Sequence, residues 1–281
     1  MVSFNSGGFI MHTQRNRIFF FGAAALTGAA TLALHRYMMA NCFDAKGLLI
    51  PGNLPGTLLW VLGIGYVLAM SAMLTTIGGN GTYADNFPRC LLSGGLMIAA
   101  GGVLILSQFE SAGNAVPAPE AALMGGLLVS RITDASMELL PWAAGLAMLV
   151  LGGYRMRGRK PFLLFSGIVC LYYMLMLVTS YRLWSADPNI HEYAYQLLAL
   201  VLLMLAAFHR TCCDAGIIQR RKLLATGLSA VVCCMASLSM EQMPGFYLAS
   251  GLWAAGSMCH VAVLPPDPEE PRDAPAEGET E

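Results

Sequence analysis

The chain has 281 residues, of which 56% are hydrophobic and only 12% charged, whereas soluble domains carry about a quarter charged residues. This composition excludes an ordinary soluble domain and indicates a membrane protein with several spans. The formal net charge of −1 is uneven: residues 265–281 carry seven acids against one arginine and hold −6, which leaves +5 on residues 1–264. The basic residues flank apolar stretches and form no basic domain, so we expect no nucleic-acid partner.

The N-terminal segment, residues 1–17, is polar and ends in a basic cluster that contains Arg15 and Arg17. The apolar run that follows is long enough to form a first span. A cleaved signal peptide is the competing interpretation. We favour an uncleaved span, because the run exceeds a typical signal core and no clear small-x-small cleavage site follows it.

Further apolar stretches follow along the chain, and about 20 residues of helix cross the hydrocarbon core of a bilayer. Turn-forming residues and basic clusters separate these stretches. We therefore predict an all-α fold, a polytopic transmembrane helix bundle that forms a single domain over residues 18–264. The tail, residues 265–281, should be disordered and cytoplasmic. The predicted spans, about eight in number, are 18–36, 57–77, 88–109, 139–155, 161–182, 192–209, 222–240 and 244–264.

The third predicted span contains two glycine pairs, Gly94-Gly95 and Gly101-Gly102. Small residues allow the backbones of neighbouring helices to approach closely, and we expect that role for these glycines. A local unwinding of the helix is the alternative.

Residues 119–138 are the most ambiguous segment. Arg131, Asp134 and Glu138 recur on one face of a helical pattern. A further span here would place the segment Arg155–Lys160 outside the cell. We therefore predict an amphipathic helix at the outer surface, which either lies in the interface or dips into the bilayer as a re-entrant segment.

The orientation follows from the distribution of basic residues, because Lys and Arg accumulate on the cytoplasmic side of a membrane. With the N-terminus inside, the inner segments hold eleven lysines and arginines and the outer segments hold four, with Arg272 left in the tail. This bias predicts a multi-pass protein of the cytoplasmic membrane with both termini inside.

The connection between the fifth and sixth predicted spans reads Tyr-Arg-Leu-Trp-Ser-Ala-Asp-Pro over residues 181–188, followed by Tyr193 and a Leu-rich span. Over about residues 161–215 the chain resembles a group of uncharacterised bacterial multi-span membrane proteins. The resemblance implies a bacterial cytoplasmic membrane and assigns no catalytic activity.

Motifs for known catalytic chemistry are absent: the sequence contains no H-E-x-x-H, G-x-S-x-G or G-x-x-x-x-G-K. The histidines are scattered, so we expect no metal site and no cofactor. Of the eight cysteines only Cys42 falls in a predicted outer segment, which excludes an outer disulfide framework within the chain. The middles of the predicted spans contain no Asp, Glu, Lys or Arg, which argues against an ion-coupled relay.

Polar side chains gather instead at the outer ends of the predicted spans. Two arginines among several carboxylates, surrounded by aromatic residues, form a candidate pocket for a small polar ligand. An interfacial aromatic belt with local ion pairs is the alternative. The candidate ligand-binding residues are Glu110, Arg131, Asp134, Glu138, Arg182, Trp184, Asp187, His191, Glu192, Gln196 and Glu241.

Three functions fit this pattern. We expect foremost a non-enzymatic sensor or accessory protein whose outward-facing pocket binds a small ligand or a membrane partner protein. The second is a permease for a neutral or zwitterionic solute, with a pathway that leads toward Gly101. The third is a membrane enzyme that acts on a lipid-linked substrate, with Glu138, His191 or Glu192 as acid–base groups.

Overall fold

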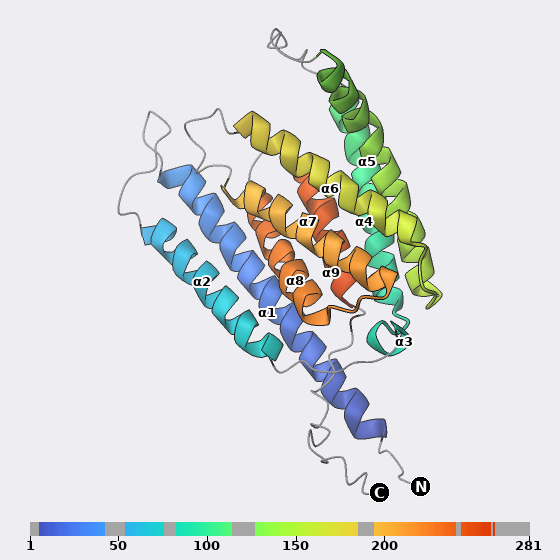
Figure 1. Cartoon of the computed structure of the whole chain (residues 1–281). Coiled ribbons are helices and arrows are strands. Elements are labelled where there is room, and N and C mark those ends of the chain that lie inside the picture. Colours follow the sequence, from blue (N-terminus) through green and yellow to red (C-terminus); the bar gives the residue numbers. More distant parts are fainter. Residues whose placement is uncertain are drawn as a thin grey trace, which may run out of the picture.

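The computed structural model of the chain describes residues 6–42, 54–75, 83–113, 127–184, 194–239, 243–259 and 261. Every regular element within these ranges is a helix (Figure 1), so the predicted all-α fold is confirmed for them. The helices are α1 (Ser6–Asn41), α2 (Leu54–Thr75), α3 (Tyr83–Asn86), α4 (Leu91–Gly113), α5 (Leu127–Met156), α6 (Leu163–Trp184), α7 (Ala194–Ala215), α8 (Arg220–Ser237) and α9 (Pro244–Cys259).

The eight long helices each overlap one predicted span, whereas the single-turn helix α3 was not predicted. Four helices contain stretches that are long and apolar enough to cross a membrane, as expected for a membrane protein; in α2 the apolar stretch, Leu54–Met70, is shorter. The number of spans therefore stays a prediction. The four stretches are Leu91–Phe109, Leu139–Met156, Leu163–Arg182 and Ala194–Ala215.

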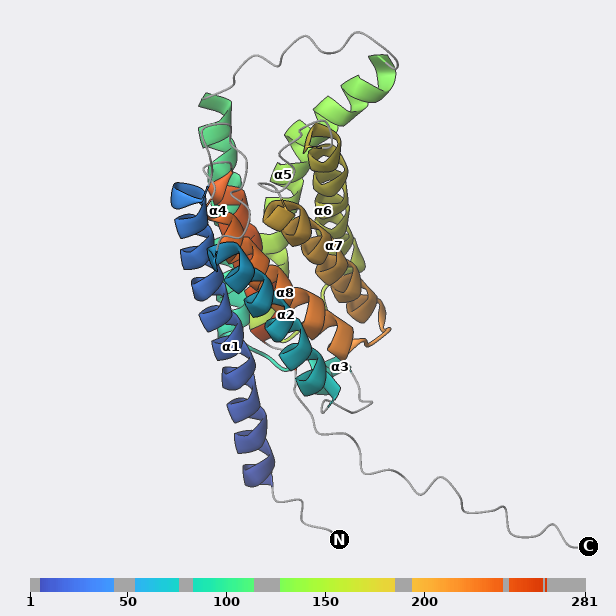
Figure 2. The same cartoon turned by 90° about the vertical axis from the view of Figure 1, so that its left-hand side faces the viewer.

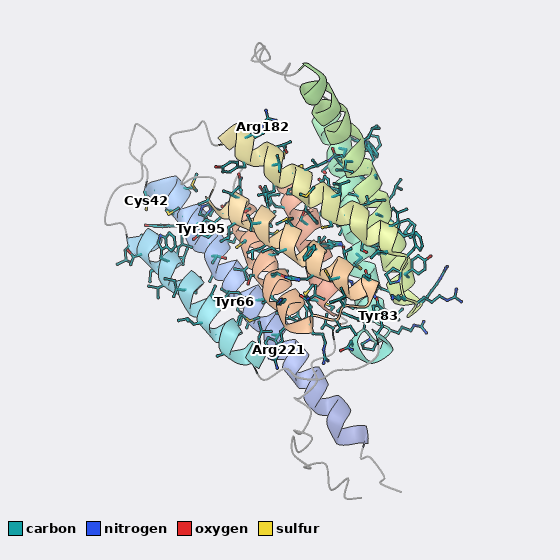
Figure 3. The ribbon with its side chains drawn as sticks, viewed as in Figure 1. Cys42, Tyr66, Tyr83, Arg182, Tyr195 and Arg221 are labelled. Atoms are coloured by element: carbon teal, nitrogen blue, oxygen red, sulfur yellow. The ribbon has the colours of Figure 1, made fainter. Side chains whose placement is uncertain are left out.

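The long helices run alternately up and down in one bundle (Figures 1 and 2). Helices α1 and α2 form one flank, α4 and α5 form another, and α8 and α9 lie between them. Tyr83 and Arg221 lie at one end of the bundle, which we call the Tyr83 end (Figure 3). Cys42 and Arg182 lie at the opposite end, the Cys42 end.

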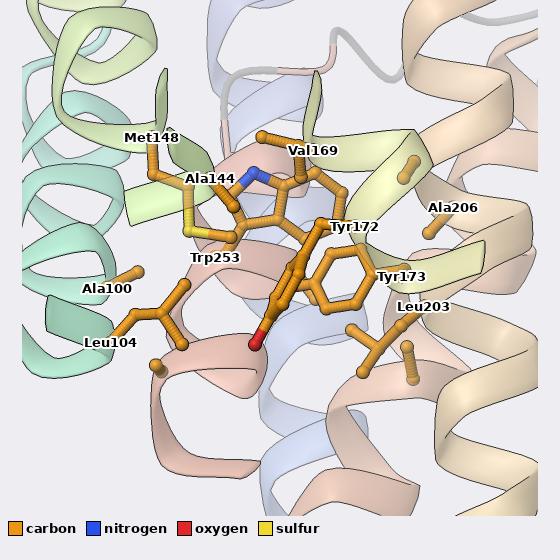
Figure 4. Close-up of a cluster of buried hydrophobic side chains, with 14 of the residues drawn as sticks. Ala100, Leu104, Ala144, Met148, Val169, Tyr172, Tyr173, Leu203, Ala206 and Trp253 are labelled. Atoms are coloured by element: carbon orange, nitrogen blue, oxygen red, sulfur yellow. The ribbon is translucent and has the colours of Figure 1, made fainter. Parts of the chain in front are cut away.

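The main hydrophobic core contains residues from α4 to α9 and is centred on aromatic side chains (Figure 4). The ring of Tyr173 lies 5.3 Å from that of Trp253 and 6.3 Å from that of Phe246, measured between centroids. Tyr172 packs against both Tyr173 and Phe246. Since Trp253, Tyr172 and Tyr173 are each at most 1% exposed, these rings fill the middle of the bundle.

Helices α4 and α5 approach closely at two glycine contacts. A Cβ atom added to Gly101 would lie 2.6 Å from the carbonyl oxygen of Gly145, and one added to Gly94 would lie 2.7 Å from that of Gly152. The predicted close approach is thus confirmed for the first glycine of each pair, and α4 remains a regular helix through both. The second glycine of each pair has open space beside it.

The prediction of a separate surface helix over residues 119–138 was wrong for the part that the structure describes. Residues 127–138 belong to α5, which continues without a break through Pro141 to Met156. Pro141 removes one backbone hydrogen bond but does not end the helix, because a proline often only bends a long helix. Figure 2 shows the first turns of α5 leaning away from the bundle.

Candidate functional site

The predicted outer site can be assessed at only two of its residues. Arg182, in the last turn of α6, is exposed, whereas Gln196, in the first turn of α7, is completely buried. Asp187, His191, Glu192 and Glu241 lie outside the described residues. Glu110, Arg131, Asp134, Glu138 and Trp184 belong to described helices, but their side chains lie outside the described part. Whether these groups converge on one pocket stays a prediction.

Buried polar groups do meet at the Cys42 end, around His35 of α1. The imidazole Nδ1 of His35 is hydrogen-bonded to the hydroxyl of Ser239, which follows the end of α8. The ring of Tyr195 from α7 packs edge-on against His35, with the centroids 4.9 Å apart. His35 is completely buried, so α1, α7 and the end of α8 meet at a polar contact.

Gln196, the residue after Tyr195, carries a primary amide whose oxygen and nitrogen make no hydrogen bond within the described residues. Leaving such a buried group without partners costs about 1–3 kcal/mol. A residue of this kind is therefore expected to have a partner that the described chain does not supply. The second ring nitrogen of His35, Nε2, is also buried and makes no hydrogen bond within the described residues.

A second buried polar group lies at the Tyr83 end and joins three helices. Asp214, near the end of α7, accepts through Oδ1 from Arg155 Nη2 of α5 at 2.8 Å and from Arg210 Nη2 of α7 at 3.0 Å. The hydroxyl of Tyr83, the first residue of α3, donates to the same oxygen at 2.9 Å. We call Tyr83, Arg155, Arg210 and Asp214 the Asp214 cluster; its two arginines and its aspartate are at most 4% exposed.

The Tyr83 hydroxyl links the members of the Asp214 cluster to one another. Its oxygen accepts from Arg155 Nη1 and, at 3.1 Å, from Arg210 Nη2. Burial raises the pKa of Tyr83 above its usual value, and the positive charge of Arg210 opposes that shift only in part. The phenol therefore stays protonated at neutral pH and keeps donating to Asp214.

Aromatic rings pack against the two guanidinium groups. The Arg210 guanidinium carbon lies 4.5 Å from the centroid of the Phe87 ring, and that of Arg155 lies 5.8 Å from it. Lys160 places its ammonium 5.6 Å from the centroid of the Tyr83 ring. Such cation–π contacts are worth about 2 kcal/mol when the cation is desolvated, which helps to keep the arginines charged inside the protein.

The Asp214 cluster was not predicted from the sequence, where Arg155 and Arg210 counted only among the eleven inner basic residues that indicate the orientation. The local signal was present, because Arg210 and Asp214 are four residues apart and so share one face of a helix. That face also contains the buried residues Ala206 and Ala207. Tyr83 of α3 and Arg155 of α5 lie far from Asp214 in the sequence, so residue spacing could not predict that they join the cluster.

Metal-binding chemistry has little support in this arrangement. Among the described residues, no group of three or more His, Cys, Asp or Glu side chains is placed to hold a metal ion. All eight cysteines are free thiols. The polar groups around His35 can form hydrogen bonds, whereas the Asp214 cluster also carries charge.

The described residues form a helical bundle in which four helices are long and apolar enough to cross a membrane, with a buried polar group toward each end. No protein-family model matches the chain, and no curated protein or solved structure shows significant similarity to it.

Proposed function

We propose that the chain is a polytopic protein of the bacterial cytoplasmic membrane that binds a small polar ligand, or a polar group of a partner protein, at the Cys42 end and catalyses no reaction. The observation that carries this proposal is the buried amide of Gln196, which makes no hydrogen bond within the described residues. It lies next to Tyr195, which contacts the His35–Ser239 pair. The predicted binding residue Arg182 lies at the same end of the bundle (Figure 3).

The membrane arrangement that we propose has eight spans, with the Tyr83 end and both termini in the cytoplasm. Two observations support it: the long helices alternate in direction (Figure 1), and each overlaps a predicted span. Arg155, Arg210 and Lys160 lie together at the Tyr83 end, where the positive-inside rule would place them.

Cysteine labelling tests this orientation. Arg159, after the end of α5, and Arg182, in the last turn of α6, are both exposed. The proposal places them on opposite sides of the membrane. In intact cells, a membrane-impermeant maleimide should label Arg182→Cys above the level of the parent chain. Arg159→Cys should be labelled only after the membrane has been opened. Labelling of Arg159→Cys in intact cells would show that the proposed orientation is wrong.

The chemistry of the binding group indicates the class of ligand. A primary amide both donates and accepts hydrogen bonds, and His35 adds a ring nitrogen with no partner among the described residues. Neither group carries a fixed charge, so a neutral or zwitterionic molecule with donors and acceptors suits them better than a bare ion. A ligand held in this way would also link α1, α7 and the end of α8.

The permease interpretation has less support. Its pathway would lead toward Gly101, but Gly101 is buried against the backbone of α5. The middle of the bundle between α4, α6 and α9 is filled by Tyr172, Tyr173 and Trp253 (Figure 4). These groups favour a binding protein with a closed interior. The acid–base groups of the enzyme interpretation, Glu138, His191 and Glu192, lie outside the described side chains, so that interpretation stays a prediction.

Gln196→Leu tests the proposed binding. Leucine has a similar size and no polar group, so burying it should leave the melting temperature of the ligand-free protein unchanged or raise it. The purified parent chain should be stabilised by at least one compound from a panel of amino acids, betaines and sugars, because a ligand that binds only the folded state raises its stability. The variant should lose that response, as measured by thermal unfolding in detergent.

Gln108→Leu provides the matched control. Gln108 of α4 is half-buried, but its amide donates to Ser107 Oγ at 3.4 Å. The Gln108→Leu variant should therefore retain the ligand response of the parent chain. If no compound in the panel stabilises the parent chain, or if both variants respond as the parent does, the proposed binding site is excluded.

A further inference from the structure

We propose that the Tyr83 end binds the phosphate group of an anionic phospholipid between the Asp214 cluster and the neighbouring residue Lys160. The proposal requires this end of the bundle to lie at a membrane surface. It does not depend on any ligand at the Cys42 end, so the two proposals can fail separately.

The first support is the imbalance of charge within the Asp214 cluster. Arg155 and Arg210 both pair with the carboxylate of Asp214, and these three side chains together carry a formal charge of +1. Lys160, which contacts the Tyr83 ring, adds a further cation. Basic groups between helices at a cytoplasmic membrane surface are a recognised kind of site for lipid phosphates.

The second support is hydrogen-bonding capacity that the described residues leave unused. Arg155 Nε donates no hydrogen bond, and Asp214 Oδ2 accepts none, within the described part of the chain. A phosphate diester with a hydroxyl-bearing headgroup offers both an anionic acceptor and a donor. Phosphatidylglycerol has this combination, whereas the choline group of phosphatidylcholine has no donor.

The third support is the surface beside the cluster, which suits acyl chains. Leu91, Phe162 and Leu164 are 59%, 64% and 58% exposed. They lie at the start of α4 and α6. Arg89, in the connection that leads to α4, donates from Nε to the carbonyl oxygen of Met156 at the end of α5, at 2.8 Å. An apolar rim next to a cationic group fits a lipid better than a free anion.

Lys160→Gln tests the proposal, because Lys160 is exposed and its loss should not disturb folding. Phosphatidylglycerol should bind the purified full-length chain in detergent and raise its melting temperature, and phosphatidylcholine should do so much less. The variant should bind phosphatidylglycerol about fivefold more weakly, as expected for one basic side chain near an anionic lipid. Native mass spectrometry of lipid-bound chains gives the affinity independently of stability.

Lys222→Gln is the matched control, because Lys222 is also exposed and lies in the first turn of α8 at the same end of the bundle. It should bind phosphatidylglycerol as the parent does. Equal weakening by both variants, or equal binding of the two lipids, would overturn the proposed site. Stabilisation by inorganic phosphate at the same concentration as the lipid would overturn the lipid as the source of the phosphate.

Discussion

Asp214→Ala should lower the free energy of unfolding by about 3–5 kcal/mol, the usual cost of removing one partner from a buried ion pair. Asp214 is the carboxylate between Arg155 and Arg210, which are 4% and 1% exposed. Without it, two buried guanidinium groups would face each other across the Tyr83 hydroxyl. SDS-induced unfolding of the purified protein, followed by circular dichroism, measures the loss.

The double variant Arg155→Ala/Asp214→Ala should recover part of this loss, because it removes one of the two repelling cations. The two residues form a contact pair, so their effects should not add. Arg157→Ala serves as the control: Arg157 is an exposed arginine two residues from Arg155, and its loss should change stability by no more than about 0.5 kcal/mol. A cost for Asp214→Ala as small as that of the control would show that the buried cluster does not hold the bundle together.

Gly101→Ala should cost about 1–3 kcal/mol, the range for overpacking a well-packed interior. The added methyl group would lie 2.6 Å from the carbonyl oxygen of Gly145. Because this oxygen belongs to the backbone of α5, it cannot move aside as a flexible side chain would. The two helices would have to separate, and the packing around Leu104 and Met148 would loosen with them. SDS-induced unfolding again provides the measurement.

Gly102→Ala is the control for this contact. Gly102 is the next residue of α4, and a Cβ atom there would have nothing within 4 Å. Alanine favours a helix over glycine by about 1 kcal/mol, so this variant should be as stable as the parent or more stable. If both alanine variants behave alike, the close approach of α4 and α5 does not contribute to stability.

The long helices could be predicted from the sequence because each contains an apolar stretch, and the length and spacing of apolar residues can be read from one segment alone. Their ends were predicted less well. The fourth span was predicted to begin at about residue 139, but α5 begins at Leu127 and continues through Pro141. A proline signals a local constraint, and only the surrounding packing decides whether the helix ends there or bends.

The candidate sites depended on the tertiary structure to a greater extent. Gln196 was among the predicted binding residues, but its complete burial could not be predicted, nor could the hydrogen bond between His35 and Ser239. These two residues are 204 positions apart, and periodicity reports only on near neighbours. The same limit applies to Tyr83 and Asp214, which are 131 positions apart.

The helical class, the approximate position of each long helix and the accumulation of cations at alternate connections could all be predicted before the fold was known. These properties depend on composition and spacing within one segment. Which polar groups meet became known only from the packed bundle, because a buried charge or amide is stabilised by its partners, and the packing of distant helices brings those partners together.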